Sequence, residues 1–374
     1  MKFFRKLFTL LLVTIAALAI IIYLFMLQPS FGKLPAGERQ KRIEKSPHYK
    51  NGSFQNLEAT RLLADDASYF TMVTKFFSTD TIREPVRELP TIKTDLKAIN
   101  DDKPTIIWFG HSTYFISIGG KKILVDPVFS ERASPVQYAG SKSYPGTMIN
   151  KPEDFPALDL VIISHDHYDH LDYNTILKLK EMTKLFCVPL GIGEHLTRWN
   201  VDAKNIREFD WWEGDFVLPD VELTATPARH FSGRGFSRNK TLWTSFVLKL
   251  YGYSIFIGGD SGYDGSFKTI GEKYGPFDVA MLECGQYDLQ WPDIHMMPEE
   301  TVQASLDLKA KAFLPVHWAK FTLALHPWKD PIQRAVKHAK AMNVSITTPL
   351  IGQPFVLNEE LPKTSWWEEP LLAK

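Results

Sequence analysis

Apolar and polar residues divide the chain into an apolar N-terminal segment, a mixed connector and a long region of short apolar runs. Residues 7–27 carry no charged side chain and are almost all apolar, and about 20 such residues span a bilayer as a helix. The connector contains one aromatic-rich stretch near residues 69–77 that predicts a helix, which would pack on the domain or contact lipid. Beyond it, runs of strand length alternate with turns and helical patterns, which is typical of an α/β protein.

These patterns predict four units and the main elements of the third. The units are a membrane anchor at 1–28, a connector at 29–100, a globular domain at 101–357 and a tail at 358–374. We expect strands at 105–108, 114–118, 122–125, 160–163, 185–188, 221–225, 244–250, 254–257, 279–282 and 312–316. We expect helices at 173–182, 267–274, 298–308 and 331–342, and a short helix that ends at Trp199.

The N-terminal apolar segment is expected to be a single-pass anchor. Lys2, Arg5 and Lys6 precede it, and basic residues favour the cytoplasmic side, so the globular domain would lie outside the cytoplasm. Basic residues that follow the segment, such as Lys33 and Arg39, make this asymmetry weak. A cleaved signal peptide is the alternative, although its apolar region would be shorter.

Composition narrows the function classes a little. The chain has 374 residues, of which 44% are hydrophobic, enough for a sizeable core. Lys+Arg and Asp+Glu both number 43, and this zero net charge argues against nucleic acid as a partner, since phosphate backbones are bound by basic surfaces. The two cysteines, Cys187 and Cys284, lie in or beside apolar runs and are expected to be buried thiols.

One stretch, Ser164–His170, carries candidate chemistry because it holds three histidines and two aspartates in seven residues. So many ionisable groups would desolvate or repel one another unless a divalent cation neutralised them. The stretch follows the apolar run 160–163, so it begins where a strand leaves the sheet, a usual place for ligands. His165 and His167 are two residues apart, and an extended segment would direct both to one point.

Other metal-type residues follow predicted strands in the same way, namely His230, Asp260 and His317. Side chains delivered from several strand ends can meet at one edge of a pair of sheets. Seven candidate ligands are too many for one tetrahedral zinc and suit two metal ions that share a carboxylate. Histidine and aspartate, rather than cysteine, leave positions open for water and substrate. The seven are His165, His167, Asp169, His170, His230, Asp260 and His317.

This set of residues resembles the metallo-β-lactamase superfamily, and within it the branch of N-acylphosphatidylethanolamine-hydrolysing phospholipases D and their bacterial relatives. The likeness spans about residues 50–355 and includes the segments 110–113, 126–135, 243–246, 259–263, 275–278 and 295–300. It implies a four-layer αββα sandwich that holds two divalent ions, with zinc expected and manganese or iron as alternatives. One ion would be bound by His165, His167 and His230, the other by Asp169, His170 and His317, with Asp260 between them.

The resemblance also implies a phospholipid substrate. The N-terminal segment, which these phospholipases usually lack, would add the membrane as a partner. Two metal ions would lower the pKa of a water between them, and the hydroxide would attack the phosphorus of a phosphodiester. Asp169 would orient that hydroxide. His295 is the candidate for contact with the leaving group or phosphate, Tyr168 could reach a phosphate oxygen, and Arg229 would pair with phosphate or form a surface ion pair. His111 is expected to be a turn residue behind the site.

Three other functions stay open on the sequence. The same dinuclear site would serve a lactonase or another small-molecule ester or phosphoester hydrolase, of the type of the ascorbate-6-phosphate lactonases. A nuclease would use the same motif, although no basic stripe is visible. A non-enzymatic scaffold is the third, although none of the metal positions has been lost.

Overall fold

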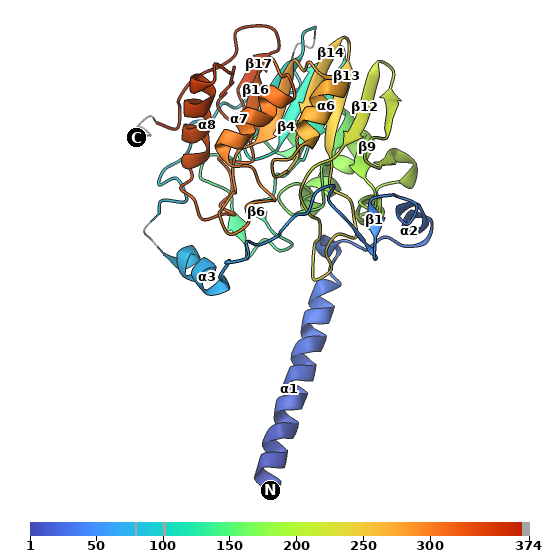
Figure 1. Cartoon of the computed structure of the whole chain (residues 1–374). Helices are drawn as coiled ribbons and strands as arrows, with labels where there is room; N and C mark the ends of the chain where they lie inside the picture. The colour runs from blue at the N-terminus through green and yellow to red at the C-terminus, as the bar shows by residue number, and fades with distance from the viewer. Residues whose placement is uncertain (79–80, 100–101, 369–374) are drawn as a thin grey trace.

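Two β-sheets form the centre of the molecule in the computed structural model, which describes residues 1–78, 81–99 and 102–368 (Figure 1). The first sheet has seven strands in the order β10-β9-β8-β5-β4-β3-β17, and the second has six in the order β11-β12-β13-β14-β15-β16. The strands of the first are β3 Thr105–Trp108, β4 Tyr114–Ile118, β5 Lys121–Val125, β8 Leu158–Ile162, β9 Thr183–Pro189, β10 Ile206–Phe209 and β17 Pro354–Val356. Those of the second are β11 Gly214–Leu218, β12 Val221–Thr226, β13 Ser245–Leu250, β14 Tyr253–Ile257, β15 Val279–Glu283 and β16 Phe313–Val316.

Alternating side chains explain why these strands read as nearly continuous apolar runs. In and just after β3, Ile106 and Trp108 enter the apolar layer between the two sheets, whereas Ile107 and Phe109 enter the layer on the outer face. Strands buried on both faces need apolar residues at every position. The layer between the sheets therefore joins both sheets into one core.

Helices cover the outer face of each sheet. Residues of α4 Tyr173–Leu179 and α5 Gly193–Arg198 pack in the apolar layer of the first sheet. Residues of α6 Ser266–Tyr274, α7 Pro298–Asp307 and α8 Asp330–Ala341 pack in that of the second sheet. The order helix, sheet, sheet, helix confirms the expected αββα sandwich. The 3₁₀ turns are Pro29–Phe31, Pro152–Asp154, Lys180–Met182 and Ala203–Asn205, and Arg132–Ala133 (β6) pairs with Ser141–Lys142 (β7).

The elements that the sequence pattern missed are short or poorly buried. The strand β11 begins with three exposed residues, and β17 has three residues in all, so neither shows a clear apolar run. The predicted helix 173–182 ends at Leu179 and continues as a 3₁₀ turn. The other predicted strands and helices differ from the structure by a few residues at their ends.

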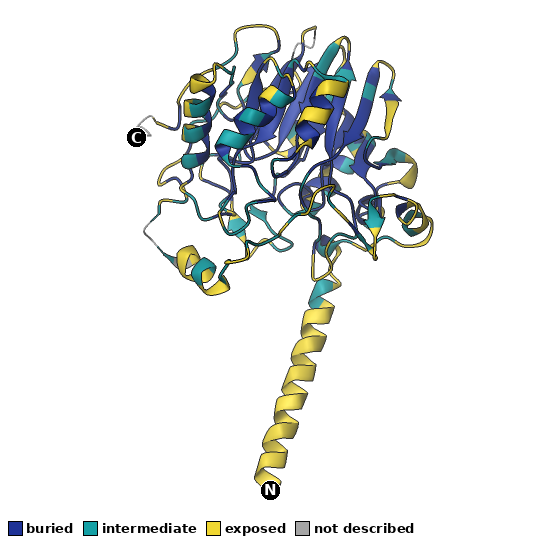
Figure 2. Ribbon diagram, viewed as in Figure 1, coloured by how far each residue is buried: buried dark blue, intermediate teal, exposed yellow. Residues whose placement is uncertain are grey.

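The N-terminal helix α1 (Lys2–Met26) projects alone from the domain and is exposed along almost its whole length (Figure 2). Among the described residues, it is the one helix long and apolar enough to cross a membrane. Its length and composition fit either a membrane anchor or a signal sequence.

The connector holds α2 (Gly37–Ile43), β1 (Tyr49–Lys50), β2 (Ser53–Phe54) and α3 (Tyr69–Phe77). Ile43 and Phe54 are buried in one apolar cluster with Trp211 and Trp243, so this part packs on the domain. Near the C-terminus, Trp366 stacks on Trp318 with 5.2 Å between ring centroids. The division at residues 28, 100 and 357 stays a prediction. Residues 100–101 and 369–374 lie outside the described part of the chain.

Candidate metal centre

Two metal-type side chains follow β8 at alternate positions of one extended segment. His165 Nε2 lies 2.9 Å from His167 Nδ1, which in turn lies 3.2 Å from His230 Nε2. Alternate residues of an extended segment point to the same side, which explains how the first two meet. His230 reaches the same point from the other sheet, after β12.

Asp260 follows β14 and lies between two groups of histidines. Its Oδ2 atom is 3.7 Å from His165 Nε2 and 3.2 Å from His170 Nε2. Its Oδ1 atom is 3.1 Å from His317 Nδ1. One carboxylate thus faces both groups. The preceding Gly259 has a φ of +61°, and a Cβ there would lie 2.8 Å from the Ser164 Cβ, so the turn needs glycine.

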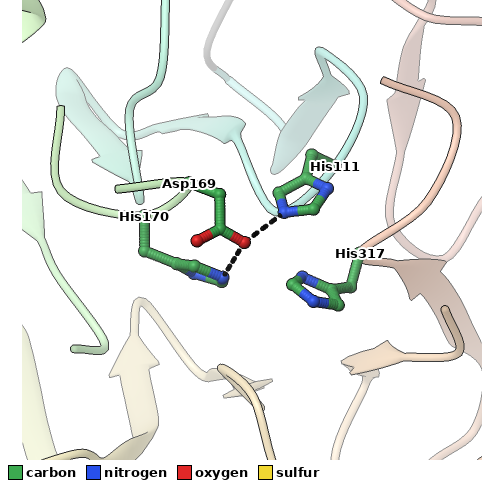
Figure 3. A group of neighbouring side chains, drawn as sticks. All are labelled: His111, Asp169, His170 and His317. Atoms are coloured by element: carbon green, nitrogen blue, oxygen red, sulfur yellow. Dashed lines mark hydrogen bonds and ion pairs between the residues drawn. The ribbon is translucent and has the colours of Figure 1, made fainter. Parts of the chain in front are cut away.

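The second group joins three of the expected ligands with His111 (Figure 3). Asp169 Oδ2 lies 2.8 Å from His111 Nε2 and 3.4 Å from His170 Nε2. His317 completes the group from the end of β16. The seven expected ligands therefore meet at one edge of the two sheets. Candidate ligand atoms lie within 4.8 Å of one another in two groups, His165, His167, His230 and Asp260, and His111, Asp169, His170 and His317.

The facing atoms fit a divalent cation better than they fit one another. Two neutral imidazole nitrogens without protons cannot bond each other, yet nitrogens bound to one tetrahedral zinc lie about 3.3 Å apart. His170 Nε2 and Asp260 Oδ1 are buried without a hydrogen bond from any described residue. Buried polar atoms normally have partners, and a cation would supply one. The donor atoms are nitrogens and carboxylate oxygens, which suit zinc and other divalent first-row ions.

Burial keeps most of these histidines neutral, the form that binds metal. It lowers the pKa of His167 to about 4 and lowers the pKa values of His165 and His230 well below the usual range. His170 differs, because the carboxylates around it outweigh burial and raise its pKa. Burial also raises the pKa of Asp260 to about 6.

Asp126, which follows β5, orients the metal loop, residues 164–170. Its Oδ1 atom accepts a hydrogen bond from the Ser164 backbone N–H at 2.7 Å, and its Oδ2 atom lies 2.8 Å from His170 Nδ1. This contact turns His170 Nε2 toward Asp260. Outer carboxylates of this kind fix the orientation of metal-binding imidazoles. In the sequence, Asp126 directly follows a predicted strand, and this position alone does not indicate an orienting role.

His111 lies closer to the site than the sequence suggested. It occupies the turn between β3 and β4 with a φ of +52°, and burial lowers its pKa to about 4. A neutral imidazole can donate from Nε2 to the Asp169 carboxylate, 2.8 Å away. His111 therefore holds Asp169, and the proximity of His317 makes it a further candidate ligand.

The residues between the metal-type side chains point to the opposite side of the loop. Tyr168 Oη donates to the Arg234 carbonyl oxygen at 2.5 Å, and the Arg234 guanidinium lies 4.1 Å from the centre of the Tyr168 ring. Phe31, just after α1, packs against the same ring. The expectation that Tyr168 contacts phosphate is therefore corrected: its side chain supports the segment that follows α1.

The segment after α1 is bound tightly to this side of the metal loop. The buried Arg234 side chain donates to the Ser30 carbonyl oxygen at 2.7 Å. The Lys33 backbone N–H donates to His195 Nδ1 at 2.9 Å, and His195 Nε2 lies 3.2 Å from Asp166 Oδ2. The junction between α1 and the domain is thus part of the folded structure.

His295 lies beside the metal-type residues and is held by a carboxylate that the sequence analysis missed. Its ring centroid is 5.0 Å from that of His230 and 5.2 Å from that of His317. Its Nδ1 atom lies 2.7 Å from Glu283 Oε2. Glu283 is fully buried at the end of β15. A charged residue that ends an otherwise apolar run was the available signal.

The remaining candidates have structural roles. Arg229 donates to the Ala59 carbonyl oxygen at 2.7 Å and lies 3.4 Å from Asp293, so it forms the ion pair that was one of its two expected roles. Cys187 and Cys284 are buried free thiols, as expected.

A cavity of about 590 Å³ opens above these residues. We call the metal-type residues at its base the floor and the mainly apolar residues around its opening the mouth. The floor consists of His167, Asp169, His230, Asp260, His295 and His317. The mouth includes Leu62, Leu63, Tyr69, Met72, Phe231, Arg238, Trp291 and Leu323.

A family model described as the beta-lactamase superfamily domain matches residues 121–318, a range that contains all seven expected ligands. The chain belongs to the beta-lactamase superfamily. It is a metal-dependent hydrolase of this superfamily, and the fold and the residue groups above agree with that membership.

Similar proteins within the superfamily include one with an assigned lipid substrate. An uncharacterized protein of Mycobacterium tuberculosis is 38% identical over 329 residues, which cover 87% of this chain and 88% of that protein. The N-acyl-phosphatidylethanolamine-hydrolyzing phospholipase D 1 of Caenorhabditis elegans is 35% identical over 230 residues, or 58% of this chain and 64% of that protein. The solved structure of Igni18, a metallo hydrolase of Ignicoccus hospitalis, shares the fold with a TM-score of 0.54, at 21% identity over 69% of this chain and 100% of that chain.

Proposed function

We propose that this chain is a membrane-anchored phosphodiesterase of the phospholipase D type that cleaves N-acylphosphatidylethanolamine or a similar phospholipid. The similarity to a relative named for that activity supports the substrate class. The observation that carries the proposal is the position of the cavity. Its mouth includes residues of α3, which lies on the side of the domain from which α1 leaves (Figure 1).

Two divalent ions, which we propose to be zinc, would be bound by the two groups of residues. His165, His167 and His230 would hold one ion, Asp169, His170 and His317 the other, and Asp260 both. When bound, the ions would supply positive charge at a phosphate oxygen and lower the pKa of a water molecule between them.

The side chains of the floor would orient the reactants. Burial alone would raise the pKa of Asp169, but the charge of His170 and the hydrogen bond with His111 lower it well below the usual range. The ionised Asp169 lines the cavity and would accept a hydrogen bond from the attacking water. His295, on the same floor, would face the leaving-group oxygen. Arg238 at the mouth would contribute positive charge near the phosphate.

One loop connects the mouth with the end of α1, which supports access from a lipid surface. Phe231 and Arg238 line the metal cavity, whereas Phe236 in the same loop lines a second cavity together with Tyr23 and Met26 of α1. Phe236 is 84% exposed. An exposed aromatic side chain beside the last turn of a membrane span would rest at the level of the lipid headgroups.

A three-substrate assay of the purified full-length protein tests the proposal. The substrates are N-acylphosphatidylethanolamine in mixed micelles, a lactone and bis(4-nitrophenyl) phosphate. We expect phosphatidic acid and N-acylethanolamine from the first. Hydrolysis of the lactone without release of phosphatidic acid would contradict the proposal and favour a small-molecule hydrolase.

We also propose that α1 remains attached as an anchor and that the domain lies outside the cytoplasm. A peptidase cut beyond Ser30 would remove a hydrogen-bond partner of the buried Arg234, which supports retention. Lys2, Arg5 and Lys6 support a cytoplasmic N-terminus. The intact mass of the membrane-extracted protein tests retention. A reporter enzyme fused after Lys374 tests the orientation, and activity of a reporter that works only in the cytoplasm would contradict it.

A further inference from the structure

Glu283 is a buried carboxylate with contacts to the loop that carries His295. Its Oε1 atom accepts a hydrogen bond from the Met296 backbone N–H at 2.8 Å, and a second backbone hydrogen bond comes from Ser261. Its Oε2 atom lies 2.7 Å from His295 Nδ1. No Lys or Arg side chain forms an ion pair with Glu283 among the described residues. Its side-chain partner is therefore the imidazole alone.

The contact with Glu283 fixes the orientation of the His295 ring relative to the cavity. With Nδ1 turned to Glu283, Nε2 lies at the opposite edge of the ring, and no described residue forms a hydrogen bond with it. The ring lies between His230 and His317 and lines the cavity. A carboxylate on one nitrogen of an imidazole sets the tautomer and the direction of the other nitrogen.

We propose that Glu283 is a positioning residue that holds His295 with Nδ1 on the carboxylate and with a proton on Nε2 directed at the leaving-group oxygen. This inference rests on the proposed phosphodiester hydrolysis and adds to it how the alcohol departs. Before the step the pair carries two protons, one on Nε2 and one between Glu283 and Nδ1.

Each proton in the step has a donor and an acceptor among these residues, the substrate and solvent. The water oxygen bonds to phosphorus as the bond from phosphorus to the alcohol oxygen breaks. The Nε2 proton passes to that alcohol oxygen, and the proton between the pair stays on Nδ1, next to an anionic Glu283. The attacking water, oriented by Asp169, loses its proton to solvent, and a proton from solvent restores Nε2.

The test compares leaving groups, because proton donation matters most for a poor one. The substrates are methyl phosphodiesters of 4-nitrophenol, 4-chlorophenol and phenol, together with N-acylphosphatidylethanolamine. The variants are Glu283→Gln, His295→Ala and both together, with Glu299→Gln as the matched control, since Glu299 pairs with Arg334 on α8. Metal content per chain and melting temperature are measured for each variant.

We expect Glu283→Gln to slow cleavage of the phenyl ester and of the lipid about 10- to 100-fold, and of the 4-nitrophenyl ester less than about threefold. Metal content should stay unchanged. His295→Ala should show the same dependence on leaving group, and the double variant should be no slower than His295→Ala. The control should match the wild type.

Several results would overturn the inference. An equal loss on all esters would indicate a general structural role, and no loss would mean that Glu283 does not position His295. Loss of one ion per chain would mean that these side chains bind metal, since Asp260, Glu283, His295 and His317 also form a possible ligand group.

If Glu283→Gln fails to fold, His295→Ala decides the inference. A dependence of its rate on the leaving group that equals that of the wild type would overturn the inference. Cleavage of the aryl esters without cleavage of the lipid would refute the lipid substrate while still testing Glu283, and a wild type inactive on every diester would refute both.

Discussion

The floor and the mouth of the cavity are built in opposite ways. The floor side chains come from strand ends of both sheets, and outer contacts orient them, as Asp126 orients His170. The helix α3 at the mouth is attached through few contacts, for example the Ser68 N–H, which donates to Gln290 Oε1 at 3.1 Å. Tyr69 and Phe70 of α3 are 73% and 79% exposed.

This difference separates chemistry from substrate choice. The fold fixes the floor, so the floor would act on any ester or phosphodiester that reaches it. The mouth lies on loops and a weakly attached helix, where sequence changes cost little stability. We therefore expect variants of the metal-binding floor residues to slow all substrates, and variants of apolar residues at or beside the mouth to slow only the lipid.

The largest effect is expected from the carboxylate between the two groups. Asp260→Ala should lower the rates on the lipid and on bis(4-nitrophenyl) phosphate by more than about 100-fold. This loss exceeds the roughly 10- to 100-fold loss that is usual when a hydrogen-bond partner of a metal ligand is changed. The bound metal, measured by elemental analysis, should fall as well. Unchanged rates on either substrate would contradict a role of Asp260 in the reaction.

A smaller effect is expected from Asp126, which contacts the expected metal ligand His170. Asp126→Asn should weaken metal binding about 10- to 100-fold, because asparagine cannot accept from both Ser164 and His170 with two carboxylate oxygens. Competition with a chelator measures the affinity. The matched control is Asp159→Asn, a buried carboxylate that pairs with Lys184 away from the site. Equal affinities in both variants would count against an orienting role.

The exposed side chains of α3 beside the mouth, such as Phe70 and Val73, should show the opposite selectivity. Phe70→Ser combined with Val73→Ser should lower hydrolysis of the lipid in vesicles about tenfold, because about 1.5–3 kcal/mol is gained when such a side chain is fully buried and partial insertion gains less. Hydrolysis of bis(4-nitrophenyl) phosphate should not change. Leu306→Ser, an exposed leucine on α7, is the control. An equal loss of rate on both substrates would contradict the view that these residues affect only the lipid.

The smallest effect concerns a buried charge near the floor. Lys320 Nζ donates to the Val128 and Phe109 carbonyl oxygens, and burial lowers its pKa to about 7. The unfolded chain keeps the usual higher pKa and binds more protons above pH 7, so stability rises with pH. Relative to Lys320→Met, the wild type should gain about 1 kcal/mol in unfolding free energy from pH 7 to pH 8. Urea unfolding at both pH values measures it, and a constant difference would contradict it.

The sequence allowed the floor to be predicted better than the mouth. The alternation of His165 and His167, and the strands that precede His230 and His317, place side chains through the regular geometry of extended chains. Glu283 was missed because a residue that acts through another leaves no spacing pattern. Tyr168 was misplaced because its neighbour Phe31 is 137 positions away in the chain, and such contacts follow from tertiary packing.

The most direct test of the proposed reaction is hydrolysis of N-acylphosphatidylethanolamine vesicles by the full-length protein in ¹⁸O-labelled water. Because water attacks phosphorus, we expect one ¹⁸O atom in the phosphate of phosphatidic acid and none in the N-acylethanolamine. Activity should disappear after removal of metal by a chelator and return with added Zn²⁺. Absence of phosphatidic acid, label in the alcohol, or full activity without metal would contradict metal-dependent attack of water on phosphorus.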